Sequence, residues 1–366
     1  MFETFWKKVL RRKPYSWLVI PAAVFWFVSV IYRLFFHVYR LTRTRATRLN
    51  VPVVSVGSIM IGGAGKTPLV EVIARGLQGE GVRVGVVSSG YGRSSREPLL
   101  LPGYKLQRIP ADMAGDEMRE LSGKLPEAIF SIARSKTDAA RALAGSGNVD
   151  VIVVDDGFQH FTLFRDIDVV AYDASFKPGH LRLFPSGVLR ESVRALRRAD
   201  MIIMTRAKFA KDIAKLRRRL GRVNPGAEVY HAGFVPEVLV SGDKSLPVKY
   251  IEDKSVFLFA GVGNFSPLRK QVAALAGDLD YALELTDHQV YDEGLLRRIK
   301  AMAGDHGSDV ILTTGKDWVK LGDFDFGREI YYLGVSVDLD PGEEKLIQQI
   351  MQKIQLERPG SNGQAI

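Results

Sequence analysis

The chain has 366 residues, of which 46% are hydrophobic and 25% are charged, so it has enough apolar material for a large core and more than one domain. It contains no cysteine, which excludes disulfides, thiolate catalysis and cysteine metal sites, and which suits a reducing compartment. The net charge of +10 would ordinarily suggest a nucleic-acid partner, so its location along the chain matters.

The basic charge is concentrated at the N-terminus. Residues 1–50 contain ten Lys or Arg and one acid, Glu3, so this segment carries +9 and the remaining 316 residues carry +1. The cations flank residues 14–32, "PYSWLVIPAAVFWFVSVIY", which have no formal charge. As a helix these residues span about 28 Å, close to the thickness of a bilayer core. We therefore expect residues 1–50 to form a membrane-associated helical segment, and we expect no nucleic-acid partner.

Three arrangements of this segment fit the sequence. It could cross the bilayer, or it could lie in the interface, because "RLFFHVYRL" continues an amphipathic pattern. A buried core helix is the third arrangement. Basic residues on both flanks leave the orientation open, and no small-residue cleavage site follows the apolar run, which disfavours a signal peptide.

After Asn50 the sequence alternates short apolar runs with helical stretches, which predicts an α/β fold with a parallel sheet. The predicted strands are 51–56, 82–87, 128–133, 149–154, 167–171 and 201–204, then 256–259, 281–285, 310–313 and 330–333. The predicted helices are 68–77, 138–143 and 191–198.

This pattern divides the chain into five parts. We expect the membrane-associated segment at 1–50, a P-loop NTPase-like parallel-sheet domain at 51–229, and a polar, turn-rich linker at 230–253 that could contain a hairpin. A second, smaller α/β domain is expected at 254–350, followed by a C-terminal tail at 351–366.

A phosphate-binding loop is predicted between the first strand and the first helix. Such a loop needs glycines where the backbone approaches oxygen, a lysine for the β- and γ-phosphates and a hydroxyl for magnesium. The strict pattern would place glycine at position 60, where this chain has methionine. The expected nucleotide-binding residues are Met60, Ile61, Gly62, Gly63, Ala64, Gly65, Lys66 and Thr67.

The second half of a nucleotide site is expected at the end of a neighbouring strand. "VDVIVVDDGFQH" places Asp155 and Asp156 directly after an apolar run, where they could hold Mg²⁺ together with Thr67. Asp156 could instead cap the turn at Gly157. The sequence has no Asn-Lys-x-Asp pattern for guanine, so ATP is the expected nucleotide.

A P-loop with a membrane segment also fits a second class of protein, a deviant-Walker ATPase of the partitioning type. Its loop reads Lys-Gly-Gly-x-Gly-Lys-Thr, and this chain has Ile61 at the signature first lysine, which argues against that class. A non-catalytic membrane scaffold is a third possibility, disfavoured by the intact Lys66, Thr67 and Asp155.

Longer blocks resemble one known family. The chain is similar to the tetraacyldisaccharide 4′-kinases, the lipid A 4′-kinases of Gram-negative bacteria, over roughly residues 15 to 335. The blocks that carry the likeness are "VGSIMIGGAGKTPLV", "SSGYGR", "GDE", "VVDDGFQH", "FPSGVLRESVRALRRAD", "DHQVYDE" and "TTGKDWVKL".

The resemblance implies transfer of the ATP γ-phosphate to the 4′-hydroxyl of a tetraacylated glucosamine disaccharide 1-phosphate, giving lipid IVA. It implies ATP and Mg²⁺ as cofactors, this lipid A precursor and inner-membrane lipids as partners, and no obligate protein partner. The implied location is the cytoplasmic face of the inner membrane, attached through the N-terminal helix.

The resemblance also implies roles for individual residues. Asp116 in "AGDEM" matches the catalytic base, His288 in "TDHQ" the partner that orients or tunes it, and Glu191 an acid near the metal or nucleotide. Without the resemblance, Asp116 and Glu117 would be ordinary acids of a first helical turn, and His288 a surface or capping histidine. We hypothesise that closure of the two α/β domains brings the His288 side onto Asp116.

Two positions depart from the family pattern. The family usually has arginine at Ser89, and a second histidine at Gln289. Five arginines could face acidic lipid, and a solvated helix face is the alternative for the last three: Arg182, Arg190, Arg194, Arg197 and Arg198.

Overall fold

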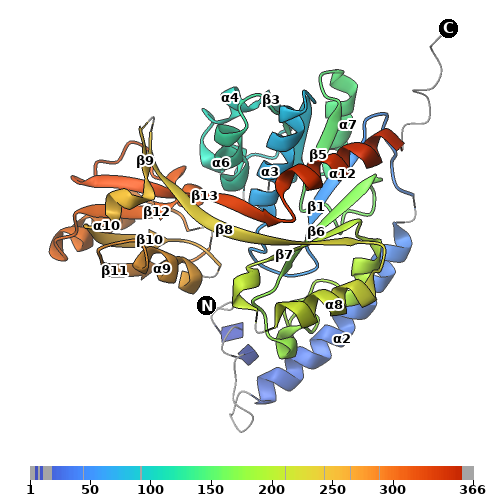
Figure 1. The fold of residues 1–366 in the computed structure, drawn as a ribbon, viewed down its shortest axis with the longest axis horizontal. Helices are drawn as coiled ribbons and strands as arrows, with labels where there is room; N and C mark the ends of the chain where they lie inside the picture. Colours follow the sequence, from blue (N-terminus) through green and yellow to red (C-terminus); the bar gives the residue numbers. More distant parts are fainter. Residues whose placement is uncertain are drawn as a thin grey trace. The chain divides into compact units, whose positions relative to one another are not determined.

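A computed structural model describes residues 5–6, 9–10, 19–43, 45–90, 93–210, 212–242, 244–263, 265–287 and 289–356. The chain folds into two compact units, each built from separate stretches of sequence (Figure 1). Unit 1 comprises Met1–Gly85, Ala140–Gly233 and Leu339–Ile366, and unit 2 comprises Val86–Ala139 and Phe234–Asp338. Helices and strands alternate in both, so the predicted α/β class is confirmed.

Unit 1 is built on parallel strands in the order β8-β7-β6-β1-β5, and β2, the next neighbour of β5, passes from unit 1 into unit 2. Its central strands are buried along their whole length, as expected for a sheet covered on both faces. The strands are β1 (Val53–Gly57), β2 (Val84–Ser88), β5 (Val151–Asp155), β6 (Ile167–Asp173), β7 (Met201–Thr205) and β8 (Glu228–Ser241). Parallel register places Val56 beside both Asp155 and Val169, so the carboxyl ends of three strands meet at one edge.

Helices of unit 1 include α3 (Lys66–Gly79), α8 (Ile213–Val223) and α12 (Glu343–Leu356), and α7 (Lys136–Ser146) begins in unit 2 and ends in unit 1. Between β6 and β8 lie three 3₁₀ turns, η1 (Pro178–His180), η2 (Val193–Arg198) and η3 (Ala207–Phe209). α12 packs on α3 so closely that a Cβ at Gly76 would lie 2.5 Å from Ile347. The tail expected from residue 351 therefore begins within a helix, and residues 357–366 lie outside the described residues.

In unit 2, parallel strands pair in the order β11-β10-β12-β13, and two further strands pair antiparallel. The parallel strands are β10 (Ser255–Ala260), β11 (Asp278–Glu284), β12 (Val310–Thr314) and β13 (Glu329–Asp340), and the pair is β3 (Leu99–Pro102) with β4 (Ile129–Ile132). The helices are α4 (Gly103–Leu106), α5 (Ala111–Ala114), α6 (Asp116–Lys124), α9 (Phe265–Ala273), α10 (Glu293–Asp305), α11 (Gly315–Trp318) and the 3₁₀ turn η4 (Val248–Ile251).

The segment 230–253, expected as a linker, is mostly sheet. β8 continues to Ser241 and pairs antiparallel with β9 (Lys244–Pro247), with Val238 opposite Pro247. The expected hairpin is therefore confirmed, and the linker range itself stays a prediction. Val229, Val238 and Val240 are β-branched residues that favour a strand, and this signal outweighs the turn residues near Gly242. The five domain ranges expected from the sequence remain predictions. In the structure, residues 86–139 and 234–338 form one compact unit.

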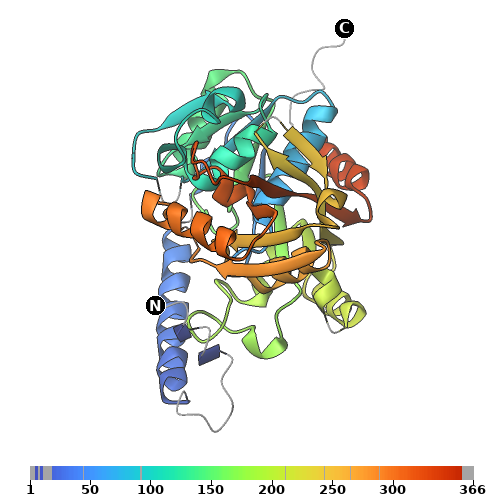
Figure 2. The same cartoon turned by 90° about the vertical axis from the view of Figure 1, so that its left-hand side faces the viewer.

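The N-terminal helix α2 (Val19–Thr42), the long blue helix in Figure 2, lies in unit 1. Its side chains divide into two different faces. Ala22 and Ser29, seven residues apart, are buried on the face toward the protein. The opposite stripe repeats with the same spacing and is exposed: Ile20, Phe27, Leu34 and Leu41. The helix is long and apolar enough to cross a membrane, and only 11% of its most apolar stretch of 18 residues is buried inside the protein. The core-helix alternative is therefore wrong, and α2 is a candidate for membrane association.

Close backbone packing at the end of β1 gives a test of this fold. A Cβ at Gly57 would lie 2.5 Å from the Cβ and 2.8 Å from the amide nitrogen of Phe158. We expect Gly57→Ala to lower the free energy of unfolding by about 1–3 kcal/mol, because backbone must move to relieve the overlap. Gly79→Ala, where nothing lies within 4 Å, is the control in urea unfolding. Equal stability of the two variants would contradict the packing described.

Candidate active site

The glycine-rich loop runs from the end of β1 to the start of α3. Gly62 has φ +95° and Gly65 has φ +81°, a left-handed conformation that side chains with a Cβ rarely adopt. Gly65 is the N-cap of α3, so Lys66 and Thr67 are its first two residues. Amides of a first helical turn have no acceptor within the helix, so these two can face an anion.

Three amides of the predicted loop already donate hydrogen bonds within the protein. The amide of Met60 donates to Ser58 Oγ at 3.0 Å, that of Ile61 to Val188 O at 2.8 Å, and that of Ala64 to Gly62 O at 2.9 Å. The remaining candidates for phosphate donors are the amides of Gly62, Gly63, Gly65, Lys66 and Thr67.

The structure gives a reason for methionine at position 60. Met60 is fully buried in the cluster that contains Ile59, Phe158 and Leu189, and it pairs with Leu189 in an isolated antiparallel bridge. The side chain at this position therefore fills the core behind the loop, where glycine would leave a cavity.

The two acids at the end of β5 have different surroundings. Asp155 is 4% exposed and pairs in register with Val56 on the strand that leads into the loop. Asp156 has φ +51°, and its carboxylate accepts hydrogen bonds from Arg190 Nη1 at 2.9 and 2.8 Å. Its Oδ1 also lies 3.6 Å from Lys66 Nζ. The loop lysine and the strand-end acids are thus brought together in unit 1.

Glu191 joins two segments that border the loop. Its carboxylate, 5% exposed, binds Arg198 Nη2 at 2.8 and 3.0 Å and accepts from Gln159 Nε2 at 3.0 Å. The same Gln159 nitrogen donates to Ser58 O at 3.0 Å, and the Arg198 guanidinium lies 4.4 Å from the centre of the Phe158 ring. The solvated helix face considered for Arg198 is therefore wrong, and the role of Glu191 near metal or nucleotide stays a prediction.

In unit 2, Asp116 begins α6 and lies beside a lysine far along the chain. Lys320 Nζ is 2.8 Å from Asp116 Oδ2 and donates to Gln289 O at 3.3 Å. Lys316 Nζ lies 2.7 Å from Asp287 Oδ1 and 3.8 Å from Glu117 Oε1. His288 itself lies outside the described residues, but both of its neighbours are held next to the start of α6.

These contacts correct the hypothesis that domain closure brings the His288 side onto Asp116. Asp116, Asp287 and Gln289 belong to the same compact unit, because Val86–Ala139 groups with Phe234–Asp338. Lys316 and Lys320 hold the two segments together within that unit. From the sequence, Asp116 was expected in the first domain because it follows the first strands. Order along the chain does not reveal that residues 86–139 pack in the same unit as residues 234–338.

The lysines are held by a buried acid and a guanidinium. Asp317, fully buried, accepts from Gly261 N at 2.9 Å and from Thr314 Oγ1 at 2.7 Å, and Arg119 of α6 donates to Val319 O. Burial lowers the pKa of Lys316, but the hydrogen bond to Asp287 and the nearby carboxylates outweigh it, so the net pKa is raised. This ammonium is therefore charged at neutral pH.

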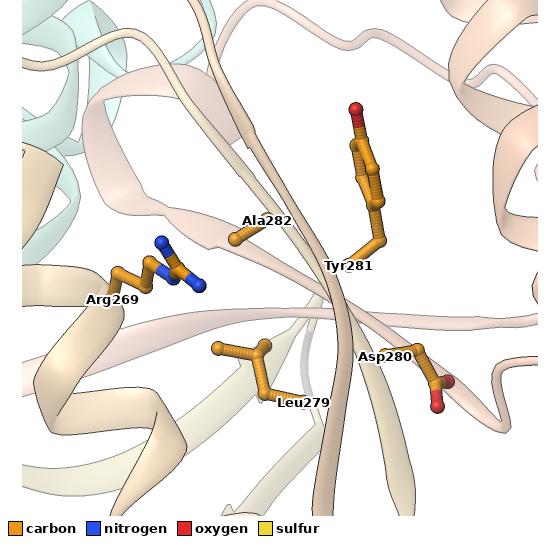
Figure 3. A pocket seen from close by; sticks show the side chains of 5 residues that line it. All are labelled: Arg269, Leu279, Asp280, Tyr281 and Ala282. Atoms are coloured by element: carbon orange, nitrogen blue, oxygen red, sulfur yellow. The ribbon is translucent and has the colours of Figure 1, made fainter.

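A pocket of about 280 Å³ lies elsewhere in unit 2, against the irregular strand β11 and helix α9 (Figure 3). Arg269, Leu279, Asp280, Tyr281 and Ala282 line it, and none of these is a predicted site residue. A register shift between β10 and β11 accompanies this stretch.

Comparisons with known proteins identify the family. The family described as tetraacyldisaccharide-1-P 4′-kinase, LpxK, matches residues 15–355. A tetraacyldisaccharide 4′-kinase of Geobacter metallireducens is 34% identical over 284 residues, covering 76% of this chain and 81% of the relative. The same enzyme of Geobacter sulfurreducens is 32% identical over 309 residues, covering 83% of each chain.

A solved structure agrees with the sequence relatives. The crystal structure of LpxK from Aquifex aeolicus, an apo form in complex with ATP, superposes with a TM-score of 0.73 at 25% identity. The match covers 91% of this chain and 99% of that one.

The chain belongs to the tetraacyldisaccharide 4′-kinase family.

The family's members are the kinases of lipid A biosynthesis, and the resemblance stated from the sequence blocks is confirmed. The sequence did not reveal that Lys316 and Lys320 form ion pairs with Asp287 and Asp116, although both lysines lie in the family block "TTGKDWVKL". Their spacing of four residues, which places two side chains on one side of a helical turn, was the available signal. Arg190, considered as a lipid-facing cation, binds Asp156 instead.

The lysine cluster makes a prediction about stability and pH. Lys316→Met leaves Asp287 without this cation, and we expect the free energy of unfolding at pH 7 to fall by about 2 kcal/mol. Because folding raises the Lys316 pKa above its ordinary value of 10.5, its contribution is complete below that pH and is lost as pH rises through the folded-state pKa.

The deficit of Lys316→Met should therefore shrink in urea unfolding above pH 10.5. Lys300→Met is the control, because Lys300 is 42% exposed and its partner Asp325 is 87% exposed. A deficit that stays constant at alkaline pH, or that matches the control, would contradict the ion-pair account.

Proposed function

We propose that this protein transfers the γ-phosphate of ATP to the 4′-hydroxyl of a tetraacyldisaccharide 1-phosphate, giving lipid IVA. The observation that carries the proposal is the approach of Lys66 Nζ to Asp156 within 3.6 Å, in a chain of this kinase family. It joins the phosphate loop to the strand-end acids that nucleotide-dependent phosphotransferases require.

The nucleotide would be held by positioning and charge. The N-terminus of α3 presents the amides of Lys66 and Thr67 to an anion, and Lys66 supplies an ammonium to the phosphates. Because phosphoryl transfer needs little covalent chemistry from the protein, such fixed donors supply much of the rate enhancement. The ATP complex of the Aquifex relative supports ATP as the nucleotide.

The residues around the loop fit Mg²⁺. Thr67 offers a hydroxyl and Asp155 a buried carboxylate, which are the hard oxygen ligands that Mg²⁺ takes together with phosphate oxygens. Among the described residues, no group of three or more His, Cys, Asp or Glu side chains could hold a metal ion by itself. Asp156 is committed to Arg190 and Lys66, so it would act next to the ion. When bound, Mg²⁺ would neutralise charge on the phosphates.

Asp116 is the proposed base for the sugar hydroxyl, with His288 orienting or tuning it and Glu191 supporting the nucleotide side. Support comes from the arrangement around Asp116 in unit 2, where Lys320 binds both its carboxylate and the carbonyl of Gln289, next to residue 288. An aspartate alone, with an ordinary pKa of about 4, is a weak base toward an alcohol unless a partner shares the proton.

Attachment to the membrane would go through α2. Its exposed stripe of large apolar residues and the basic flanks of residues 1–50 fit the cytoplasmic face of the bacterial inner membrane, where an acylated substrate resides. Inner-membrane lipids and the lipid A precursor are the proposed partners, with neither nucleic acid nor an obligate protein partner.

A direct assay separates the kinase from the partitioning ATPase. Incubation of the full chain with labelled ATP, Mg²⁺ and detergent-dispersed disaccharide 1-phosphate should transfer label to the lipid and give the bisphosphate. ATP hydrolysis without labelled lipid would support the ATPase and overturn the kinase.

Replacement of the proposed base should affect turnover rather than nucleotide binding. We expect Asp116→Asn to lower kcat by about 10²- to 10⁴-fold, the usual contribution of a general base, with little change in the Kd for ATP. Asp112→Asn, on the neighbouring helix α5, is the matched control. A variant of Asp116 that retains full kcat would remove it from the mechanism.

The exposed apolar side chains of α2 should determine membrane binding. Phe27 and Phe35 are 61% and 78% exposed, and we expect Phe27→Asp with Phe35→Asp to weaken sedimentation with vesicles of bacterial lipid by about tenfold or more. Tyr104→Asp, a 45% exposed aromatic residue in unit 2, is the control. Undiminished sedimentation of the double variant would exclude this face as the anchor.

A further inference from the structure

The backbone of Arg190 is held from two sides. Its amide donates to Ile59 O at 2.7 Å, at the start of the phosphate loop. Its carbonyl accepts a hydrogen bond of 3.0 Å from the hydroxyl of Tyr32, which lies in the middle of α2. One peptide segment is therefore fixed between the apolar helix and the loop.

The side chain of Arg190 continues this connection into the nucleotide site. Its Nη1 binds both carboxylate oxygens of Asp156, which in turn lies 3.6 Å from Lys66 Nζ. Arg190 is 28% exposed and Asp156 31% exposed, so the pair is partly shielded from solvent. Movement of the Arg190 backbone would therefore change the position of Asp156 beside the loop lysine.

Further contacts fasten α2 to the segment that ends at Arg190. Ser29 Oγ donates to Leu183 O at 3.0 Å and accepts from Ser186 N at 2.9 Å. Trp6, which precedes α2, also donates to this segment, from Nε1 to Pro185 O at 2.6 Å. The ring of Tyr32 meets Phe184 edge to face, with 6.4 Å between centroids. An anchor that only attached the protein to a bilayer would not need polar bonds at the middle of an apolar helix.

The hydroxyl of Tyr32 stays protonated at neutral pH. Burial raises its pKa, the positive charge of Arg190 opposes this, and the negative charge of Glu191 adds to it, with a net increase. The group is therefore available as a donor over the physiological range.

We propose that α2 is a working part of the nucleotide site as well as an anchor, and that Tyr32 is a positioning residue for Arg190 and Asp156. This inference rests on the proposed function of Lys66 and Asp156. It predicts that the membrane helix contributes to nucleotide binding even when the lipid substrate is absent.

The test is Tyr32→Phe in the full chain in detergent micelles, with Tyr39→Phe as the matched control on the same helix. Tyr39 contacts Phe161 and Arg43 through its ring. We expect Tyr32→Phe to weaken binding of labelled ATP, measured by equilibrium dialysis with Mg²⁺, about fivefold, which is the effect of one ordinary hydrogen bond. The Mg²⁺ concentration at half-maximal ATP binding should rise by a similar factor, and the control should change neither quantity.

A double-mutant cycle with Arg190→Ala separates positioning from general loosening of α2. In the Arg190→Ala background, Tyr32→Phe should have no further effect on ATP binding, because the connection to Asp156 is already broken. Equal and additive losses in both backgrounds, or an unchanged ATP affinity of Tyr32→Phe, would overturn the proposal.

Lys66→Ala distinguishes failure of this inference from failure of the proposed function. If Lys66→Ala binds ATP normally, the proposed nucleotide site is wrong. If Lys66→Ala loses binding while Tyr32→Phe and Tyr39→Phe both keep it, only the positioning role of Tyr32 is wrong.

Discussion

The ion pairs of Asp156 with Arg190 and Lys66 connect the parts on which the nucleotide site depends. Asp156 follows β5, Lys66 begins α3, and Arg190 lies on the segment that borders the loop. Parallel pairing of β1 with β5 brings the first two together, because both strands end at the same edge of the sheet. Charged partners that are partly shielded interact more strongly than exposed ones, so this arrangement stabilises one position of the loop lysine.

In unit 2, lysine side chains lie between carboxylates that would otherwise repel one another. Asp116, Glu117 and Asp287 would repel one another if they were alone, and Lys316 and Lys320 lie among them. The buried carboxylate of Asp317 fixes the turn that carries both lysines. The result is a proposed base held at the start of a helix, beside the residues that flank position 288.

The apolar helix α2 combines two physical requirements on opposite faces. One face carries Ser29 and Tyr32, whose hydroxyls bond to the backbone of residues 183–190. The other presents a stripe of large apolar side chains, which is costly in water and favourable in a lipid interface. The bonds of Ser29 and Tyr32 dock the first face of α2 on the rest of unit 1.

The sequence by itself determined the α/β class, the positions of the predicted strands, the glycine-rich loop before α3 and the family. Apolar runs and glycine spacing are local signals, and blocks such as "VVDDGFQH" are specific in their order. Only the tertiary structure decided that Met60 and Ile61 use their amides within the protein, that Arg190 binds Asp156, and that Asp116 shares a unit with Asp287 and Gln289. These facts depend on which distant segments pack together, and single-sequence periodicity carries no information about such pairing.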